Sequence, residues 1–205
     1  MKKIILIILY LFIFNSSAVA LVEVDITRGN LDPLPIAVSP LHVEAGSKEI
    51  KQADGKIIKN VGDEISKVIE VNFRRSGLFN PLKKDSFVQT PDVAHVKPRF
   101  EDWRLIKAQA LVTGKVTVSD DKLRVEFRLW DVVAAKEMVA LAFSTTPENW
   151  RRVAHIISDK IYQRLTGEEG YFDTRIIYVS ETGPKTQRYK KLAIMDQDGA
   201  NVKYL

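Results

Sequence analysis

The chain has 205 residues, of which 45% are hydrophobic and 28% charged, a balance typical of a folded globular protein. This composition excludes a wholly disordered chain and a collagen-like fibre. The absence of cysteine excludes disulfides, thiolate metal sites, a cysteine nucleophile and a lipidated N-terminal cysteine. The formal charge of +5 falls to +3, with 29 basic and 26 acidic residues, once Lys2 and Lys3 in a removable leader are left out. So small and scattered an excess does not indicate nucleic-acid binding.

Residues 1–20 have the parts of a secretory signal peptide. Lys2 and Lys3 precede an unbroken apolar run of eleven residues, 4–14, and the segment ends in the small-x-small pattern of Ala18-Val19-Ala20. We predict cleavage between Ala20 and Leu21. The apolar run is shorter than the roughly 20 residues that span a bilayer, so an uncleaved membrane tether is the less favoured alternative. An exported, bacterial-type protein without a lipid anchor is expected in the periplasm.

The mature chain is predicted to begin with a strand. Apolar and polar residues alternate along it, which gives a strand one apolar and one polar face. A turn follows at Gly29-Asn30, and prolines close the connection to the rest of the chain. Two interpretations stay open: an ordinary edge strand, or a strand donated to the sheet edge of a partner, with the apolar side chains filling pockets. The segment consists of Leu21, Val22, Glu23, Val24, Asp25, Ile26 and Thr27.

Residues 34–108 predict a short strand, a long helix and a poorly patterned stretch. The strand lies at 35–40, between two prolines. The helix begins with Asn60 as its cap and Asp63 in capping-box position, and it ends at Gly77 in the left-handed conformation. We expect loop over 80–99 with a short strand at 86–88, then a short helix over 100–108. The long helix has an apolar stripe of Val61, Ile65, Val68, Ile69 and Phe73.

Residues 110–167 predict an antiparallel meander followed by a second long helix. Three strands at 110–118, 123–130 and 136–145 are separated by short turns. Thr146 as cap and Pro147 at the first helical position open the helix. Its apolar stripe consists of Trp150, Val153, Ala154, Ile157, Ile161 and Leu165. Residues 21–167 therefore predict one α/β (α+β) domain, with two main helices on a mixed sheet of about five strands.

Residues 168–205 differ from the rest of the chain. Strands at 175–180 and 191–195 are joined by a polar loop, and a third strand begins at Val202. Two or three strands without a covering layer are marginally stable, which indicates the beginning of a larger all-β domain. The intervening turn Asp196-Gln197-Asp198-Gly199 is interpreted as a hairpin turn rather than a calcium loop, because its glycine comes early and no glutamate follows.

No set of residues in the sequence indicates an active site. His42, His95 and His155 are far from ligand spacing, and His155 is expected to be a packed, hydrogen-bonded core residue. There is no G-x-S-x-G motif, and neither Gly-Lys pair continues as a phosphate loop. We therefore predict no enzyme: no catalytic residue, no cofactor-binding residue, no cofactor and no metal ligand. The remaining conspicuous side chains, expected in the core or covering the sheet, are Trp103, Trp130 and Trp150.

Several segments resemble the TolB family, the periplasmic components of the Tol-Pal system of Gram-negative bacteria. The densest matches are Ile161-Tyr162, Leu165-Thr166-Gly167, Gly170, Phe172, residues 174–179 and residues 192–201. Weaker matches lie at 76–79, 110–114 and 128–131.

This resemblance implies an N-terminal α/β domain followed by a six-bladed β-propeller. Proteins of this kind join the inner-membrane protein TolA to the outer-membrane lipoprotein Pal, support outer-membrane integrity and membrane invagination during cell division, and are exploited by colicins. The resemblance places the TolA contact on Leu21 to Thr27 and the Pal contact on the propeller. Residues 168–205 match only part of a first blade, so the chain looks like a fragment or a split gene product, and Pal binding is expected of a complete propeller.

The leading hypothesis is thus a non-catalytic periplasmic adaptor. Three alternatives stay open: a periplasmic hydrolase fragment whose active site lay in the missing propeller, a nucleic-acid-binding module, and a truncated product without function. Export and the small net charge oppose the nucleic-acid alternative.

Overall fold

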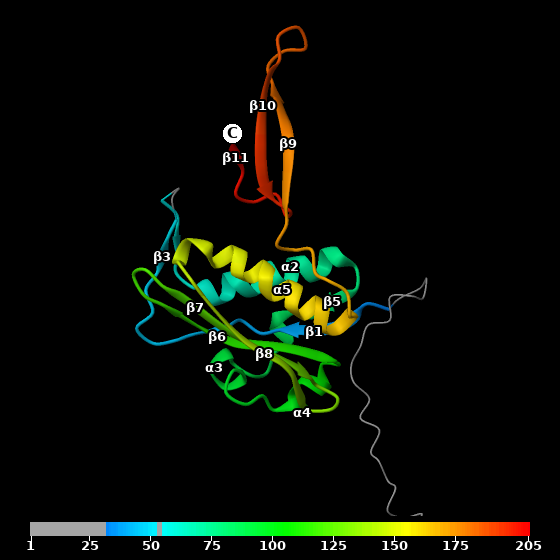
Figure 1. Ribbon diagram of the computed structural model, residues 1–205. Helices are drawn as coiled ribbons and strands as arrows, with labels where there is room; N and C mark the ends of the chain where they lie inside the picture. Colours follow the sequence, from blue (N-terminus) through cyan, green and yellow to red (C-terminus); the bar gives the residue numbers. More distant parts are fainter. Residues whose placement is uncertain (1–31, 53–54) are drawn as a thin grey trace, which may run out of the picture.

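A computed structural model describes residues 32–52 and 55–205 (Figure 1). The signal peptide, its cleavage site and the strand predicted at 21–27 lie outside the described residues. Within the ranges that are described, no helix has both the length and the apolar character needed to cross a bilayer.

The body of the molecule, which we define as described residues 32–167, is built on a six-stranded mixed sheet. The order is β5-β1-β6-β7-β8, and β2 pairs with β6 beyond the end of β1. β1 is parallel to both of its neighbours, whereas β6, β7 and β8 form the antiparallel meander that the sequence predicts. The strands are β1 (Leu34–Val38), β2 (His42–Val43), β5 (Phe79–Pro81), β6 (Ala110–Val118), β7 (Leu123–Asp131) and β8 (Lys136–Thr145).

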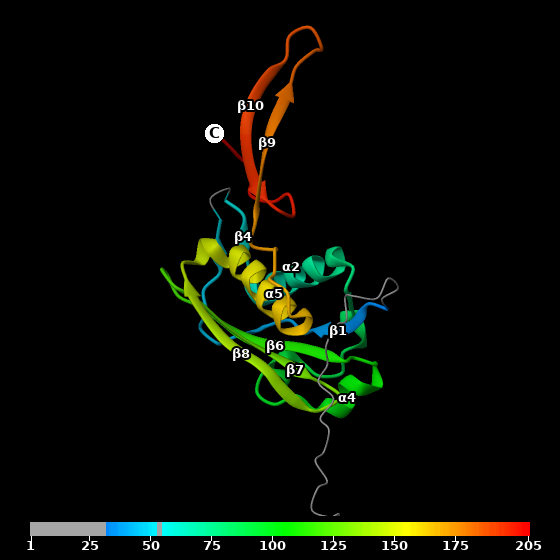
Figure 2. The same cartoon turned by 45° about the vertical axis from the view of Figure 1, so that its right-hand side comes forward.

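Two long helices, α2 (Val61–Ser76) and α5 (Trp150–Thr166), cover one face of this sheet (Figures 1 and 2). The predicted cap of α2 is confirmed, because the Asn60 side chain accepts a hydrogen bond from the Asp63 N–H at 3.1 Å. Gly77 and Gly167 end the helices with φ of 74° and 78°, a left-handed conformation that costs glycine little. Every residue of the two predicted apolar stripes is buried in one core between helices and sheet.

The opposite face of the sheet carries a smaller layer made of α3 (Pro91–Ala94) and α4 (Phe100–Leu105). Trp103 is buried there, whereas Trp150 joins the main core and Trp130 is half-buried, its indole N–H bonded to Thr113 Oγ1 at 2.9 Å. The expectation that the tryptophans pack in the core or on the sheet is confirmed. This second core consists of Ala37, Ala94, Trp103, Ala108, Leu111 and Val132.

The strand predicted at 86–88 is wrong. A short 3-10 helix, η1 (Lys84–Ser86), lies there, and the extra strand is β5, which runs parallel to β1. The cause is long-range, because the backbone N–H and C=O groups along the free side of β1 need hydrogen-bond partners. The segment around β5 supplies them: Leu34 N–H donates to Leu78 C=O and Leu82 N–H donates to Ile36 C=O, both at 2.9 Å. The local sequence pattern of residues 80–99 does not show that a distant strand requires a hydrogen-bonding partner there.

The prediction that Thr146 caps the second helix is also wrong. A 3-10 turn, η2 (Pro147–Asn149), precedes α5, and the Thr146 side chain makes no capping bond to it. Thr146 Oγ1 instead accepts a hydrogen bond from the Asn149 side-chain amide at 3.1 Å. Proline does occupy the first position of this turn, as expected.

Two further small sheets complete the fold. β3 (Ile50–Lys51) pairs with β4 (Ile57–Ile58) before α2. At the C-terminal end, β9 (Arg175–Thr182), β10 (Tyr189–Asp196) and β11 (Lys203–Tyr204) form a three-stranded antiparallel sheet, which we call the hairpin sheet. It projects from the helical side of the body (Figures 1 and 2). Apolar side chains on both of its faces are exposed, among them Ile176, Ile177, Val179 and Tyr204.

Candidate functional site

The hairpin sheet meets the body at a polar junction, formed by the turn between β10 and β11 and the facing sides of α2 and α5. Hydrogen bonds hold this turn in shape: Gly199 N–H donates to Asp196 C=O and Asp196 N–H to Ala200 C=O, both at 2.9 Å. The predicted hairpin turn is thereby confirmed. The same turn directs Gln197 and Asp198 toward the helices, where each has a buried partner.

Asn72 of α2 is the centre of the junction and is fully buried. Its Oδ1 accepts a hydrogen bond from Gln197 Nε2 at 3.0 Å. Its Nδ2 contacts His155 Nδ1 at 3.0 Å and donates to Ser158 Oγ at 2.9 Å. One amide thus connects α2, α5 and the turn, and its two bonds to α5 are made away from water, where an unpaired group is costly.

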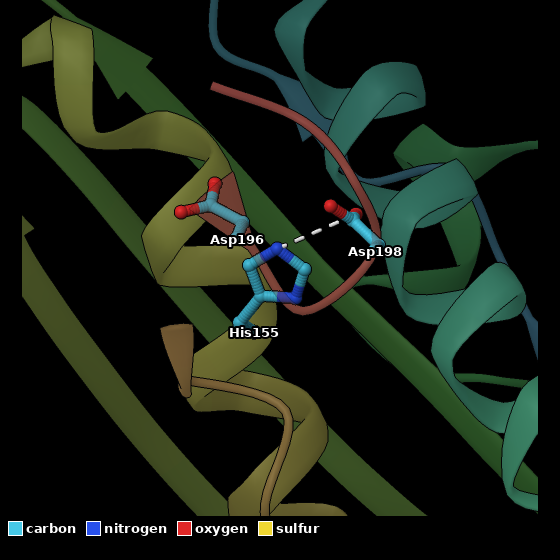
Figure 3. A group of neighbouring side chains, drawn as sticks. All are labelled: His155, Asp196 and Asp198. Carbon is cyan, nitrogen blue, oxygen red and sulfur yellow. Dashed lines mark ion pairs between the residues drawn. The ribbon is translucent and has the colours of Figure 1, made fainter. Parts of the chain in front are cut away.

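These contacts determine which nitrogen of His155 carries the proton. Asn72 Oδ1 already accepts from Gln197, so the amide NH2 group faces the imidazole and donates to Nδ1. Neutral His155 therefore carries its proton on Nε2, which lies 3.6 Å from Asp198 Oδ2. Figure 3 shows the imidazole between the carboxylates of Asp196 and Asp198, with its Nε2 toward Asp198.

Asp198 is the anionic member of the junction. Its side chain is only 4% exposed and forms an ion pair with Arg151 of α5. The other carboxylate oxygen accepts from the Ala200 N–H at 3.1 Å. Burial opposes ionisation, but the Ala200 N–H and Arg151 outweigh it and lower the pKa of the Asp198 carboxyl. At neutral pH the turn therefore presents a carboxylate to α5.

The pKa of His155 is shifted in the opposite direction from that of a histidine paired only with an acid. Burial is the largest influence and lowers the pKa of His155, even though Asp198, Asp196 and Asp173 favour the charged form. Arg151 adds to the lowering. The neutral imidazole that the hydrogen bonds require is therefore also the form that the electrostatics favour.

His155, Asp196 and Asp198 are close enough to be considered as metal ligands, since one ligand atom from each lies within 4.8 Å of the others. Their surroundings favour a different role. A metal at Nε2 needs the lone pair there, but the Asn72 amide directs the proton to that nitrogen. Arg151 already neutralises Asp198, and Asn201 Nδ2 donates to Asp196 Oδ2 at 2.6 Å. The donor chemistry fits a structural connection between the turn and α5.

The sequence-predicted residues divide into three groups. Leu21 to Thr27 and Ala20 lie outside the described residues, so the predicted partner-binding strand stays a prediction. His155 is buried and hydrogen-bonded, as expected. His42 and His95, far apart in sequence, stack with ring centroids 4.5 Å apart. The sequence pattern does not predict the junction. The signal that could have indicated it is a polar residue, Asn72, at helical spacing from Val68 and Ile69 on the apolar side of the predicted helix.

Comparisons with known proteins agree with this fold. Residues 22–138 match the family model of the TolB amino-terminal domain. The chain is 70% identical over 202 residues to the Tol-Pal system protein TolB of Pelagibacter ubique (strain HTCC1062); the match covers 96% of this chain and 45% of that protein. The chain thus spans about half the length of that curated relative.

The fold is shared with a crystal structure of TolB from Acinetobacter baumannii. The TM-score is 0.66 at 24% sequence identity, over 84% of this chain and 38% of that one. The mixed sheet with two main helices is therefore the fold expected from the sequence, and neither comparison favours a hydrolase fragment. By its family-model match and its identity to a curated relative, the chain belongs to the TolB family, whose amino-terminal domain it contains.

Proposed function

We propose that this chain acts as a non-catalytic periplasmic adaptor of the Tol-Pal system. The observation that carries the proposal is the 70% identity to a Tol-Pal system protein TolB over nearly the whole chain. As an adaptor it contributes to the connection between TolA in the inner membrane and Pal in the outer membrane, and so to outer-membrane integrity and invagination during division. Export by the signal peptide of residues 1–20 brings it to the periplasm.

In this proposal TolA binds the segment from Leu21 to Thr27. Strand addition requires free backbone groups and alternating side chains, and the segment supplies apolar residues at every second position, at Val22, Val24 and Ile26. The backbone supplies affinity and the apolar face selects the pocket. The polar face, with Glu23 and Asp25, stays in water.

Residues 168–205 form part of the first blade of a β-propeller in this proposal. Supporting it, the hairpin sheet is antiparallel and exposes apolar side chains on both faces, as a blade does before its neighbours stack on it. The junction around Asn72 then joins that blade to the N-terminal α/β domain of residues 21–167. The Pal contact belongs to the complete propeller.

The test is capture of the TolA periplasmic domain by the exported chain, purified from the periplasm, with its N-terminus established by mass spectrometry. We expect the protein to begin at Leu21 and to retain TolA. A Val24→Glu/Ile26→Glu double variant is expected to lose at least about tenfold in affinity, because two charges replace the apolar anchors.

The control is Thr27→Glu, which adds one glutamate to the polar face instead of the apolar face and is expected to bind as the wild type does. The single variants Val24→Glu and Ile26→Glu, each with the same added charge, are its matched comparison. Far-ultraviolet circular dichroism establishes that all variants are folded. Undiminished TolA binding by the double variant would overturn the strand-donation proposal, and Pal, tested separately, reports on the second contact.

A further inference from the structure

The body has two sheet edges, and they are protected very differently. β5, at one edge, is three residues long and ends in Pro81, and such short, proline-bearing strands are poor templates for further pairing. β8, at the other edge, is ten residues long and, within the described chain, pairs with β7 alone. Of the two sheet edges in the described chain, β8 is therefore the open one.

The register identifies the backbone groups that β8 leaves unpaired. Val132 N–H donates to Gln109 C=O and Ser119 N–H to Lys122 C=O, so even-numbered residues of β7 bond toward β6. By the alternation of an antiparallel ladder, odd-numbered residues of β7 bond toward β8, where they face odd-numbered partners such as Leu141 and Phe143. Ala140, Ala142 and Ser144 consequently direct N–H and C=O groups outward.

Within the described chain, the part of this edge from Val139 to Phe143 has no feature that discourages another strand. From Met138 to Phe143 β8 has neither charge nor proline. Ala140 and Ala142 are exposed, and Leu141 is 42% exposed although it points to the helical side. Natural sheets usually protect a long edge with lysine, proline or a covering segment, so an apolar edge of this length is a sign of an interaction site.

A basic groove lies beside the edge, between β8 and α5. Its volume is about 360 Å³, and its lining includes Leu141, Lys160 and Arg164. Within the described ranges neither Lys160 nor Arg164 has a carboxylate partner; Arg164 Nε donates only to the Met138 C=O, at 3.4 Å. On the other face of the sheet the arginines are paired, Arg124 with Glu126 at 2.9 Å and Arg128 with Glu137 at 3.4 Å. The uncompensated charge is therefore on the α5 side.

We propose that the β8 edge binds an extended segment of another protein, added to the sheet as a further strand, with carboxylates on the face that turns toward α5. Its outward-facing side chains would lie over Ala140 and Ala142, which leave room for β-branched residues. A second copy of this chain fits less well, because two-fold pairing of β8 strands would bring Lys160 and Arg164 of both copies together. This edge accepts a strand, whereas residues 21–27 donate one, so the two proposals are independent.

The probe is a fluorescein-labelled synthetic peptide of alternating valine and glutamate, titrated with the whole exported chain at low salt and followed by fluorescence anisotropy. We expect saturable binding. A peptide with lysine in place of glutamate tests the charge, and one with N-methyl groups at alternate amides tests the backbone bonds; both are expected to bind at least about tenfold more weakly.

Two protein variants test whether the peptide binds at the β8 edge. Ala142→Pro removes an outward N–H but no bond to β7, so the fold is retained while peptide affinity falls about tenfold. Lys160→Glu/Arg164→Glu is expected to reverse the preference toward the lysine peptide. Equal peptide binding by a folded Ala142→Pro variant would overturn the proposal. So would the absence of saturable binding, or a dimer in sedimentation that Ala142→Pro abolishes.

Discussion

Asn72 satisfies three groups, two on α5 and one in the β10–β11 turn, which makes it the single residue on which the junction depends most. Asn72→Ala leaves His155 Nδ1 and the Gln197 amide without their partner inside the protein. We expect the free energy of unfolding to fall by about 3 kcal/mol, the cost of stranding buried polar groups. Urea unfolding measures it, with Arg74→Ala on the exposed side of the same helix as a control that stays within about 0.5 kcal/mol. Equal effects of the two variants would contradict the assignment.

The lowered pKa of His155 predicts how the free energy of unfolding depends on pH. Burial lowers its pKa in the folded protein below the ordinary 6.5. The unfolded chain therefore binds the proton first as the pH falls, so the contribution of His155 is complete above pH 6.5 and is lost as the pH drops toward the folded-state pKa. We expect His155→Gln to flatten the decline in unfolding free energy between about pH 7 and pH 5. An unchanged slope in denaturant titrations of the variant would contradict it.

At the scale of elements, β5 is the strand at which the sequence-based prediction and the structure differ. Phe79 is 3% exposed and packs against Phe73 and Tyr162, with ring centroids 4.9 and 6.1 Å away. Val88, in the segment predicted as a strand, is 65% exposed. We expect Phe79→Ala to cost about 3 to 5 kcal/mol and Val88→Ala less than about 0.5 kcal/mol, both measured by thermal and urea unfolding. The opposite ranking would restore the original prediction.

The same contrast explains which elements could be predicted. α2 and α5 follow from local information: an asparagine cap, left-handed glycines and apolar residues at helical spacing. β6, β7 and β8 follow from alternation and short turns. β5 is too short to have a pattern of its own and exists because β1 needs a partner. The junction is hidden for the same reason, since Asn72, His155 and Asp198 become neighbours only once three distant segments have packed.

At the scale of the whole molecule, the body and the hairpin sheet differ in how they are stabilised. The body has a continuous core that joins both long helices to the sheet. Within residues 175–205, burial of hydrophobic side chains is confined to Ala193. The hairpin sheet is thus held by its own ladder and by polar contacts: Gln197 with Asn72, Arg151 with Asp198, and Arg75 with the Gln197 C=O at 3.0 Å. Local opening of the hairpin sheet should require less free energy than opening of the body.

Hydrogen–deuterium exchange tests this difference and the role of the junction together. In the wild type we expect amides of β9 and β10 to exchange well before those of β6 and β7, because few buried contacts oppose their opening. Asp198→Asn keeps the shape of the turn but weakens its attraction to Arg151, so exchange should accelerate in residues 175–204 while residues 110–131 keep the wild-type rate. Faster exchange throughout the chain would mean that the junction supports the body as well, and unchanged exchange would mean that the β10–β11 turn is held by its backbone bonds alone.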